Sequence, residues 1–306
     1  MSEGLSSERR RLLRRASILF AAAIATVAAA GISVRAAAST RAHFPAPPKG
    51  AIVYSRELGH DALALGVVPQ RGRVLVQASV LGSQGQGVTG MRVSFGVHDG
   101  NRKAAHACGP GCYRATLSVR GRPAGIDALV NGRRWRVTMP ARWPAPSGAT
   151  LMARARRAWR SLRSVSYVDR LASGPGQSVL STWQVQAPDR IAYEVWGGGD
   201  SVVIGAKRWD LAPGGNKWVE SDQLAVKQPV PFWVSVADAH VLGTARVNGT
   251  PAWQVSFFDP GTPAWFDVMI DRKTMLALNM HMITTAHFMS DSYSQFNSTP
   301  SIQPPR

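Results

Sequence analysis

Short runs in which apolar and polar residues alternate dominate the chain between residues 50 and 143. In MRVSFGVH, residues 91–98, every second residue from Met91 to Val97 is apolar. This alternation predicts a strand with one buried face. Similar runs, divided by turn residues, recur at 74–81, 112–119 and 133–140. A series of short strands without a helical period predicts a small antiparallel β-sandwich over residues 50–143.

A helical pattern follows at SGATLMARARRAWRSLRSV, residues 147–165. Leu151, Ala155, Trp159 and Leu162 fall on one stripe at helical spacing, and arginines occupy the opposite face. Two interpretations of the basic face remain open. It is solvated while the helix packs on a sheet, or it contacts lipid headgroups.

Strand-like runs then follow one another to residue 297 with no further helical pattern. Such a series predicts an up-and-down antiparallel sheet over residues 148–297. One helix and a long meander suggest a curved sheet with the helix on its concave face, and the overall class is mainly β (α+β). Residues 298–306 are expected to form a flexible tail.

A candidate ligand cavity follows from this architecture, because one helix cannot fill a wide curved sheet. Between residues 276 and 283 the alternation places Leu276, Leu278, Met280 and Met282 on one face, with His281 on the other. The candidate ligand-binding residues are therefore Trp159, Leu162, Leu276, Leu278, Met280 and Met282. Flexible thioethers suit the wall of an apolar site.

The N-terminus predicts export. Residues 9–15 read RRRLLRR, and the uncharged run 16–34 ends at Arg35. This pattern predicts a cytoplasmic basic tail at 1–15, a single-pass membrane anchor at 16–35 and extracytoplasmic domains after it. A signal peptide cleaved near residues 36–38, which would leave a secreted protein, is the alternative. Residues 36–49 are interpreted as a Pro-rich spacer.

The chain has 36 Lys and Arg against 18 Asp and Glu, with much of the excess in residues 71–164. Such an excess suits either nucleic acid or an anionic membrane surface. The predicted anchor favours the membrane, so the expected partner of the basic region is a membrane surface and not nucleic acid. The pattern does not indicate an oligomeric state.

Cys108 and Cys112 are the only cysteines, within CGPGC. Export favours a disulfide between them, since the Gly-Pro-Gly loop can bring two strand ends within bridging distance. The alternative is a copper site, because thiolates, thioethers and imidazoles bind Cu(I). That site would use the cysteines with His106, or the soft ligands His281, His287 and Met289 in the region 280–289.

Catalytic signatures are missing from the sequence: there is no GxSxG, HExxH or Walker motif, and the acids are scattered. We therefore expect a non-enzymatic protein without a cofactor, copper being the alternative. The leading functional hypothesis is a membrane-tethered binding protein for an apolar ligand. A copper-handling surface protein and an envelope interaction or sensing module without a small ligand remain alternatives.

Two resemblances support this organisation. VLVQASVLGSQGQGVTGMRVSF, CGPGCYRATL and RRWRVTMP resemble YtkA-like domains, which implies an immunoglobulin-like sandwich over residues 50–143. RSLRSVSYVDRLASGPG, QAPDRIAYEV, SVVIGAKRWDLAPGGNKWV and FDVMIDRKTMLALNMHMI resemble the LolA and LppX superfamily of lipoprotein carriers over residues 148–297. The second resemblance implies an open half-barrel with a helical lid over an apolar cavity that binds acyl chains or lipoproteins.

Overall fold

The computed structural model describes residues 45–98, 100–284, 287–298 and 300–306. The predicted cytoplasmic tail, the predicted anchor at 16–35 and the spacer up to residue 44 lie outside the described residues. Within the described ranges, no helix is long and apolar enough to cross a membrane. This part of the chain is mainly β, with antiparallel sheets and one α-helix, as the alternation predicts.

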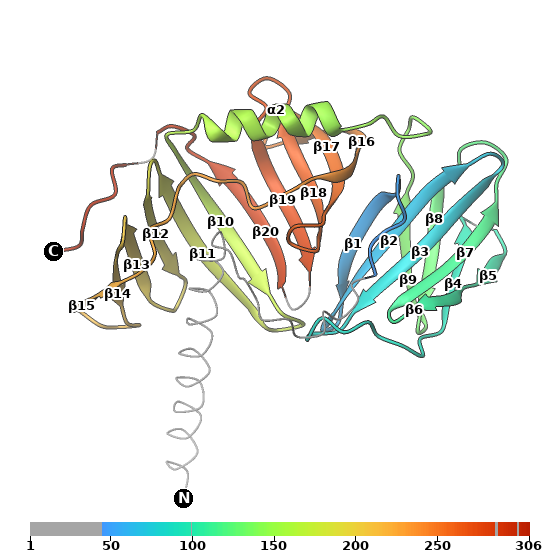
Figure 1. Cartoon of the computed structure of the whole chain (residues 1–306), viewed down its shortest axis with the longest axis horizontal. Helices are drawn as coiled ribbons and strands as arrows, with labels where there is room; N and C mark the ends of the chain where they lie inside the picture. Colours follow the sequence, from blue (N-terminus) through green and yellow to red (C-terminus); the bar gives the residue numbers. More distant parts are fainter. Residues whose placement is uncertain (1–44, 99, 285–286, 299) are drawn as a thin grey trace, which may run out of the picture.

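The first domain consists of two antiparallel sheets that share one core (Figure 1). The five-stranded sheet has the order β1 (Ile52–Leu58), β2 (Asp61–Gln70), β3 (Arg73–Leu81), β7 (Cys112–Ser118) and β6 (His106–Gly109). The four-stranded sheet has the order β5 (Arg102–Ala104), β4 (Val93–Val97), β8 (Gly125–Val130) and β9 (Arg133–Thr138). Inward-facing Leu65, Val76, Phe95 and Ile126 are fully buried, so the alternating positions supply the core of the sandwich.

The second domain is one curved sheet of eleven strands. Its first half, from the edge inward, is β15 (Trp218–Asp222), β14 (Lys207–Leu211), β13 (Asp200–Ile204), β12 (Arg190–Val195), β11 (Ser178–Gln186) and β10 (Ser164–Ala172). It continues with β20 (His287–Ser294), β19 (Ala277–Thr284), β18 (Ala264–Asp271), β17 (Thr250–Asp259) and β16 (Ala237–Val247). All neighbouring strands are antiparallel.

The connection between β15 and β16 departs from a simple meander. β10 pairs with β20 in the middle of the sheet, which leaves β15 and β16 at opposite edges. The chain therefore passes from one edge to the other through residues 223–236, here called the crossing segment. Trp233 of this segment is buried among side chains of the concave face. The half-barrel is thus open along its two edges, and the crossing segment spans its concave side (Figure 1).

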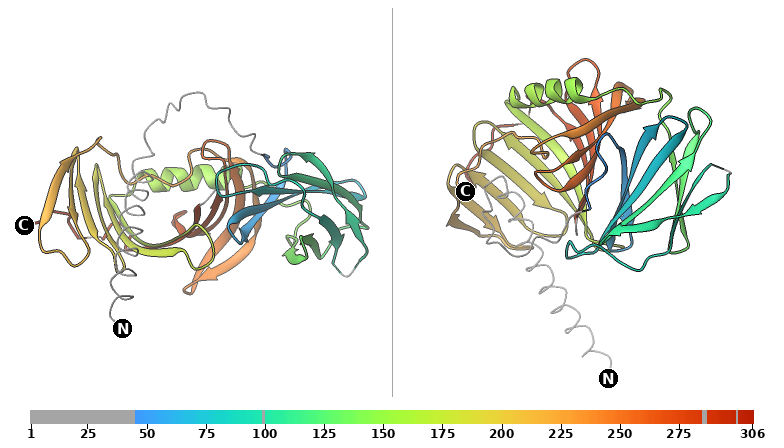
Figure 2. Two further views of the ribbon diagram at one scale, coloured as in Figure 1. Left: turned by 90° about the horizontal axis from the view of Figure 1, so that it is seen from below. Right: turned by 45° about the vertical axis from the view of Figure 1, so that its right-hand side comes forward.

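The helix α2 (Ala149–Arg160) lies inside the curve of the sheet (Figure 2). Met152, Ala155 and Trp159 form its buried face, whereas Arg154, Arg157 and Arg160 are exposed. The helix ends at Arg160, earlier than the predicted 165, because the Ser161 hydroxyl and backbone N–H both bond to the carbonyl of Ala158. Val165 then pairs with Val185 in the ladder of β10 and β11 but stays in the same core.

The two domains share a buried apolar contact. Val53, Ala62, Ala64 and Leu81 on the outer face of the five-stranded sheet meet Phe258, Trp265, Ile283 and Phe288 on the convex face of the half-barrel. Arg170 and Glu57 form an ion pair at 3.3 Å beside this contact. The strands β17, β18 and β19 consequently carry apolar residues on both faces, one for each core.

Both ends of the described chain are held against the domains. In the predicted spacer, the carbonyls of Pro45 and Ala46 accept hydrogen bonds from Ser79 at 2.6 Å and Gln77 at 2.8 Å. In the predicted flexible tail, Ile302 is buried, and its carbonyl accepts a hydrogen bond from Arg190 at 2.5 Å. Side-chain donors therefore hold the backbone at these positions of the predicted spacer and tail.

Candidate ligand-binding cavity

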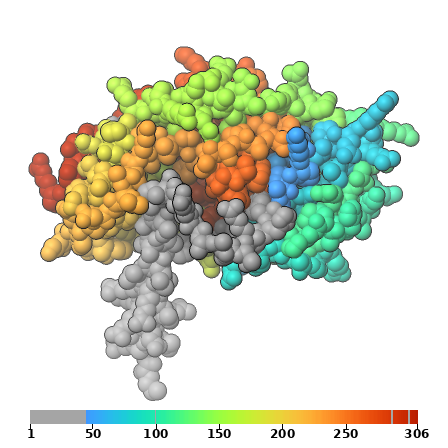
Figure 3. All heavy atoms as spheres, in the orientation of Figure 1, coloured from blue at the N-terminus to red at the C-terminus, as the bar shows by residue number. Residues whose placement is uncertain are grey.

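A cavity of about 590 Å³ lies between the concave face, α2 and the crossing segment. Its wall from the sheet is mostly aliphatic and aromatic, made of Val165, Tyr167, Leu171, Trp183, Val185, Ile191, Met282 and Met289. Trp159 of α2 and Ala225 to Val234 of the crossing segment complete it. In Figure 3, the green surface of α2 lies beside the orange surface formed by the C-terminal half of the chain. A site of this size and character suits an apolar small molecule.

Aromatic contacts hold the wall in place. Trp183 stacks between Tyr167, at 5.8 Å between ring centroids, and Tyr193, at 4.3 Å. Trp159 meets Trp233 at 6.1 Å and Tyr293 at 5.0 Å. Such offset and edge-to-face pairs stabilise one arrangement of the rings beyond the burial of their area. Rings from the sheet, from α2 and from the crossing segment therefore define the wall.

Asp259 anchors the crossing segment to the sheet. Its carboxylate accepts hydrogen bonds from the backbone N–H groups of Val234 at 2.7 Å and Ser235 at 3.0 Å. It also accepts from Gly261 N–H at 2.8 Å and the Thr262 hydroxyl at 2.9 Å. Charge-assisted bonds of this kind to backbone donors are strong. The hydrophobic pattern does not indicate this role of Asp259, although an Asp before Pro-Gly is a signal for a turn.

A pair of buried carboxyl groups interrupts the apolar wall. Asp169 of β10 and Asp291 of β20 oppose each other across the sheet, and Asp169 lines the cavity. Their residues are 5% and 1% exposed. The Tyr293 hydroxyl donates to Asp291 Oδ2 at 2.6 Å. Sequence reasoning found no paired acids, because the pairing depends on strand register between distant segments.

Burial shifts both carboxyls of this pair toward the protonated state. Burial raises the pKa of Asp169 to about 6, against its hydrogen bonds with Asp291 and Ser181. Burial, followed by the nearby charge of Asp169, raises the pKa of Asp291 well above its usual value. Two facing carboxyls avoid holding two charges by sharing a proton. The pair therefore makes the cavity wall more polar without placing two negative charges in it.

Positive side chains lie at the edge of the cavity. Arg156 and Arg160 of α2 and Lys227 of the crossing segment belong to its lining. The Arg156 guanidinium donates to the carbonyl of Val234 at 2.5 Å, which ties the helix to the crossing segment. An anionic group on a ligand would find attraction here, while its apolar part lies against the rings.

The predicted cavity residues have different positions. Trp159 and Met282 line the cavity. Leu162, Leu276 and Met280 are buried in the same core but outside the lining. Leu278 lies at a bulge, since Met269 pairs with Asn279 whereas Ile270 pairs with Ala277, and it is not part of the core. The extra residue breaks the alternation on which its placement depends.

The soft ligands of the copper alternative lie on different faces of the sheet and in different domains. His281 pairs with Ser290, whereas Met282 pairs with Met289, so His281 and Met289 lie on opposite faces of the sheet. His287 shares the face of Met289, and His106 belongs to β6 of the sandwich. Among the described residues no group of three or more His, Cys, Asp or Glu side chains is placed to hold a metal ion.

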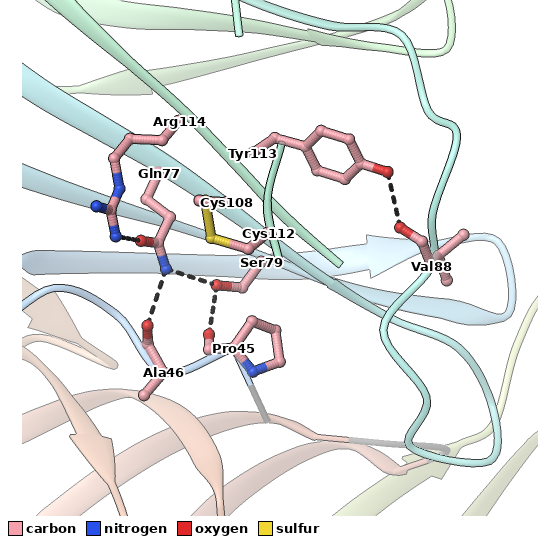
Figure 4. The surroundings of a disulfide bond; sticks show 9 residues. All are labelled: Pro45, Ala46, Gln77, Ser79, Val88, Cys108, Cys112, Tyr113 and Arg114. Carbon is pink, nitrogen blue, oxygen red and sulfur yellow. Dashed lines mark hydrogen bonds between the residues drawn. A yellow bond between two sulfur atoms is a disulfide. The ribbon is translucent and has the colours of Figure 1, made fainter. Parts of the chain in front are cut away.

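Cys108 and Cys112 form the predicted disulfide, with their Cα atoms 5.0 Å apart (Figure 4). Gly111 has a φ of +67°, and a Cβ there would lie 2.3 Å from the carbonyl oxygen of Val80. The Gly-Pro-Gly loop is therefore needed for this close approach. The next residue, Tyr113, is buried and donates to the Val88 carbonyl at 2.8 Å.

We expect removal of this disulfide to have a small effect. Replacing Cys108 and Cys112 by Ser should lower the free energy of unfolding by no more than about 2 kcal/mol, because the closed loop is short. Urea unfolding followed by Trp fluorescence measures this difference. A loss of cooperative unfolding in the double variant would contradict the expectation and assign the bond a larger role.

Neither the protein-family models nor the curated proteins contain a match to this chain. Similar solved structures do exist. LprF from Mycobacterium bovis has 12% identity and a TM-score of 0.37, over 53% of this chain and 99% of that chain. The Mycobacterium tuberculosis lipoprotein LppX has 13% identity and a TM-score of 0.35, over 50% and 97%.

A LolA superfamily protein from Nitrosomonas europaea has 8% identity and a TM-score of 0.23, over 51% of this chain and 96% of that chain. The neighbours thus include LprF, the lipoprotein LppX and a LolA superfamily protein. About half of this chain is covered in each case, at low identity and low TM-score. The functional argument therefore relies on the side chains of this chain alone.

Proposed function

We propose that this protein binds an apolar chain, such as the acyl chain of a lipid or lipoprotein, in the cavity of its half-barrel. The cavity carries this proposal: about 590 Å³ lined by rings and aliphatic side chains, under a helix and a bridging segment. Small-molecule sites commonly occupy about 300–1,000 Å³ and are mostly apolar. The positive edge at Arg156, Arg160 and Lys227 favours a ligand with an anionic head.

The proposed location is outside the cytoplasm, on a single-pass anchor at residues 16–35, or secreted if that segment is cleaved. The Cys108–Cys112 disulfide supports an oxidising compartment. The sandwich, whose sequence resembles YtkA-like domains, would act as a base for the half-barrel through their shared apolar contact. The proposed activity is binding, not catalysis.

Blocking the edge of the cavity should weaken acyl binding. Ala225 is exposed and lines the cavity, so an Ala225→Trp substitution places a large ring at its edge without disturbing the core. We expect a fluorescent fatty acid to bind this variant at least about tenfold more weakly, a loss of about 1.4 kcal/mol. Fluorescence titration measures the affinity, and native mass spectrometry shows any lipid retained from expression.

Ala212→Trp is the matched control, because Ala212 is also exposed but lies in the turn between β14 and β15, away from the cavity. It should bind the probe as the unmodified protein does. Two outcomes would refute the proposed function: no binding of any acyl probe by the unmodified protein, or equal affinities of the two tryptophan variants.

A further inference from the structure

The crossing segment exposes aliphatic side chains beside the cavity. Leu224, Val230 and Val234 are 68%, 46% and 65% exposed. Val230 and Val234 belong to the lining of the cavity, and Leu224 precedes the lining residue Ala225. Isolated exposed aliphatic residues are ordinary on protein surfaces, but a group at the edge of a binding site marks an interaction surface.

Basic residues accompany these aliphatic side chains. In α2 and the turn after it, Arg154, Arg157, Arg160 and Arg163 are exposed. The exposed Lys227 lies within the crossing segment itself. Residues 147–163 and 223–236 contain no Asp or Glu, so this surface carries one sign of charge. The hydrogen bond from Arg156 to the Val234 carbonyl at 2.5 Å joins the two segments into one surface.

We propose that this surface, formed by the basic face of α2 and the crossing segment, docks on an anionic lipid bilayer. Arginine and lysine near such a bilayer are attracted to its headgroups, and aliphatic side chains between them gain by entering the boundary of the acyl region. A hydrated nucleic acid would give the aliphatic residues no favourable contact. Anchors at protein interfaces are more often Trp, Tyr and Arg than Val or Leu.

The docked orientation has a functional consequence, which depends on the proposed lipid-binding function. The edge of the cavity would face the bilayer, so an acyl chain could move between bilayer and cavity with little exposure to water. Exposure of an acyl chain to water is costly, and the cost grows with each CH₂ group. The docking surface would therefore serve as the site of ligand exchange.

The test uses the full chain reconstituted in nanodiscs of phosphatidylcholine alone or mixed with phosphatidylglycerol. Because both native cysteines form the disulfide, a single cysteine introduced by Val234→Cys can carry an environment-sensitive fluorophore. Val219→Cys provides the matched site, since Val219 is 62% exposed on the edge strand β15. We expect spin-labelled lipids to quench the label at position 234 more than at 219, and only in phosphatidylglycerol.

Arg154→Glu combined with Arg157→Glu should shift the docking equilibrium toward the undocked state by at least about tenfold, and so should high salt. Neither residue lines the cavity, so acyl uptake from solution should persist. Equal quenching at both positions, or no dependence on phosphatidylglycerol, overturns docking. Shielding at position 234 that varies with protein concentration would instead indicate a second copy on this face.

The two proposals fail separately. Uptake of the fatty-acid probe without lipid quenching at position 234 would overturn docking and leave the binding function standing. Quenching without any uptake would support docking and overturn the binding function.

Discussion

Raising the pH from about 4 to about 7 is expected to lower the free energy of unfolding of this protein substantially. The cause is a set of buried aspartates that prefer to be protonated in the folded state. Burial raises the pKa of Asp169 to about 6, against its hydrogen bonds with Asp291 and Ser181. Burial also raises the pKa of Asp267 to about 6, against its hydrogen bond from Gln254. The pKa of Asp291 is raised further, by burial and by the charge of Asp169.

The direction follows from proton binding. An unfolded aspartate loses its proton near pH 3.8, whereas folded Asp169 and Asp267 keep theirs until about pH 6. Between these values the folded state binds more protons than the unfolded state, so the free energy of unfolding falls as pH rises. At about 1.4 kcal/mol per pKa unit, the shift of Asp267 accounts for a decrease of about 3 kcal/mol by pH 7. Asp169, which shares a proton with Asp291, adds a decrease in the same direction. Asp291 extends the decrease to higher pH.

Two histidines act in the opposite direction. Burial lowers the pKa of His240 and of His281, although nearby groups partly oppose the shift. The folded state therefore binds fewer protons at these residues below about pH 6.5, which favours unfolding as the pH falls. Since His281 lies opposite Asp267 on the neighbouring strand, the two effects overlap at the domain contact. Variants are needed to separate them.

Asp169→Asn and Asp267→Asn should each flatten the pH profile and stabilise the protein at pH 7.5, with little effect at pH 4. Urea unfolding at both pH values measures the change. Asp200→Asn is the control, because Asp200 is partly exposed on β13 and should leave the profile as it was. If neither buried variant changes the difference in the free energy of unfolding between pH 4 and pH 7.5, the aspartates are not the source of that difference.

Alternation along single strands predicted the mainly β class and the inward positions of Met280 and Met282. It could not predict Leu278, because a bulge adds one residue without any local signal in the hydrophobic pattern. The apolar residues on both faces of β18 do carry a signal. Trp265 and Phe266 are adjacent in sequence and serve different cores. A strand without clean alternation indicates burial on both sides, and hence a partner for the convex face.

The crossing segment and the carboxyl pair were not predictable from local pattern. Residues 223–236 have neither helical nor strand periodicity, and Trp233 and Asp259 hold them in place through contacts made only after folding. The Asp169–Asp291 pair requires the register between the first and last strands of the second domain. Both features depend on the order of strands in the sheet, which short-range alternation does not encode.

Trp265→Ala is expected to produce the largest loss of stability from a single substitution. Trp265 is fully buried on the convex face of the half-barrel, among Phe258, Ile283, Phe288 and residues of the sandwich. Removing a buried Trp typically costs about 3–5 kcal/mol, because the cavity it leaves closes only in part. Here the cavity would open at the contact between the domains, so the loss should affect their coupling as well as their stability.

Calorimetry distinguishes these two effects. If the shared apolar contact couples the domains, the unmodified protein should unfold in one transition, with equal calorimetric and van't Hoff enthalpies. The Trp265→Ala variant should then show a lower Tm and separate transitions, one for each core.

Val219→Ala, at an exposed position of β15, should leave the unfolding profile unchanged. A variant that keeps one transition and loses less than about 1 kcal/mol would show that the contact adds little, since exposed substitutions commonly have effects of that size. The sandwich would then be an independent neighbour of the half-barrel and not its base.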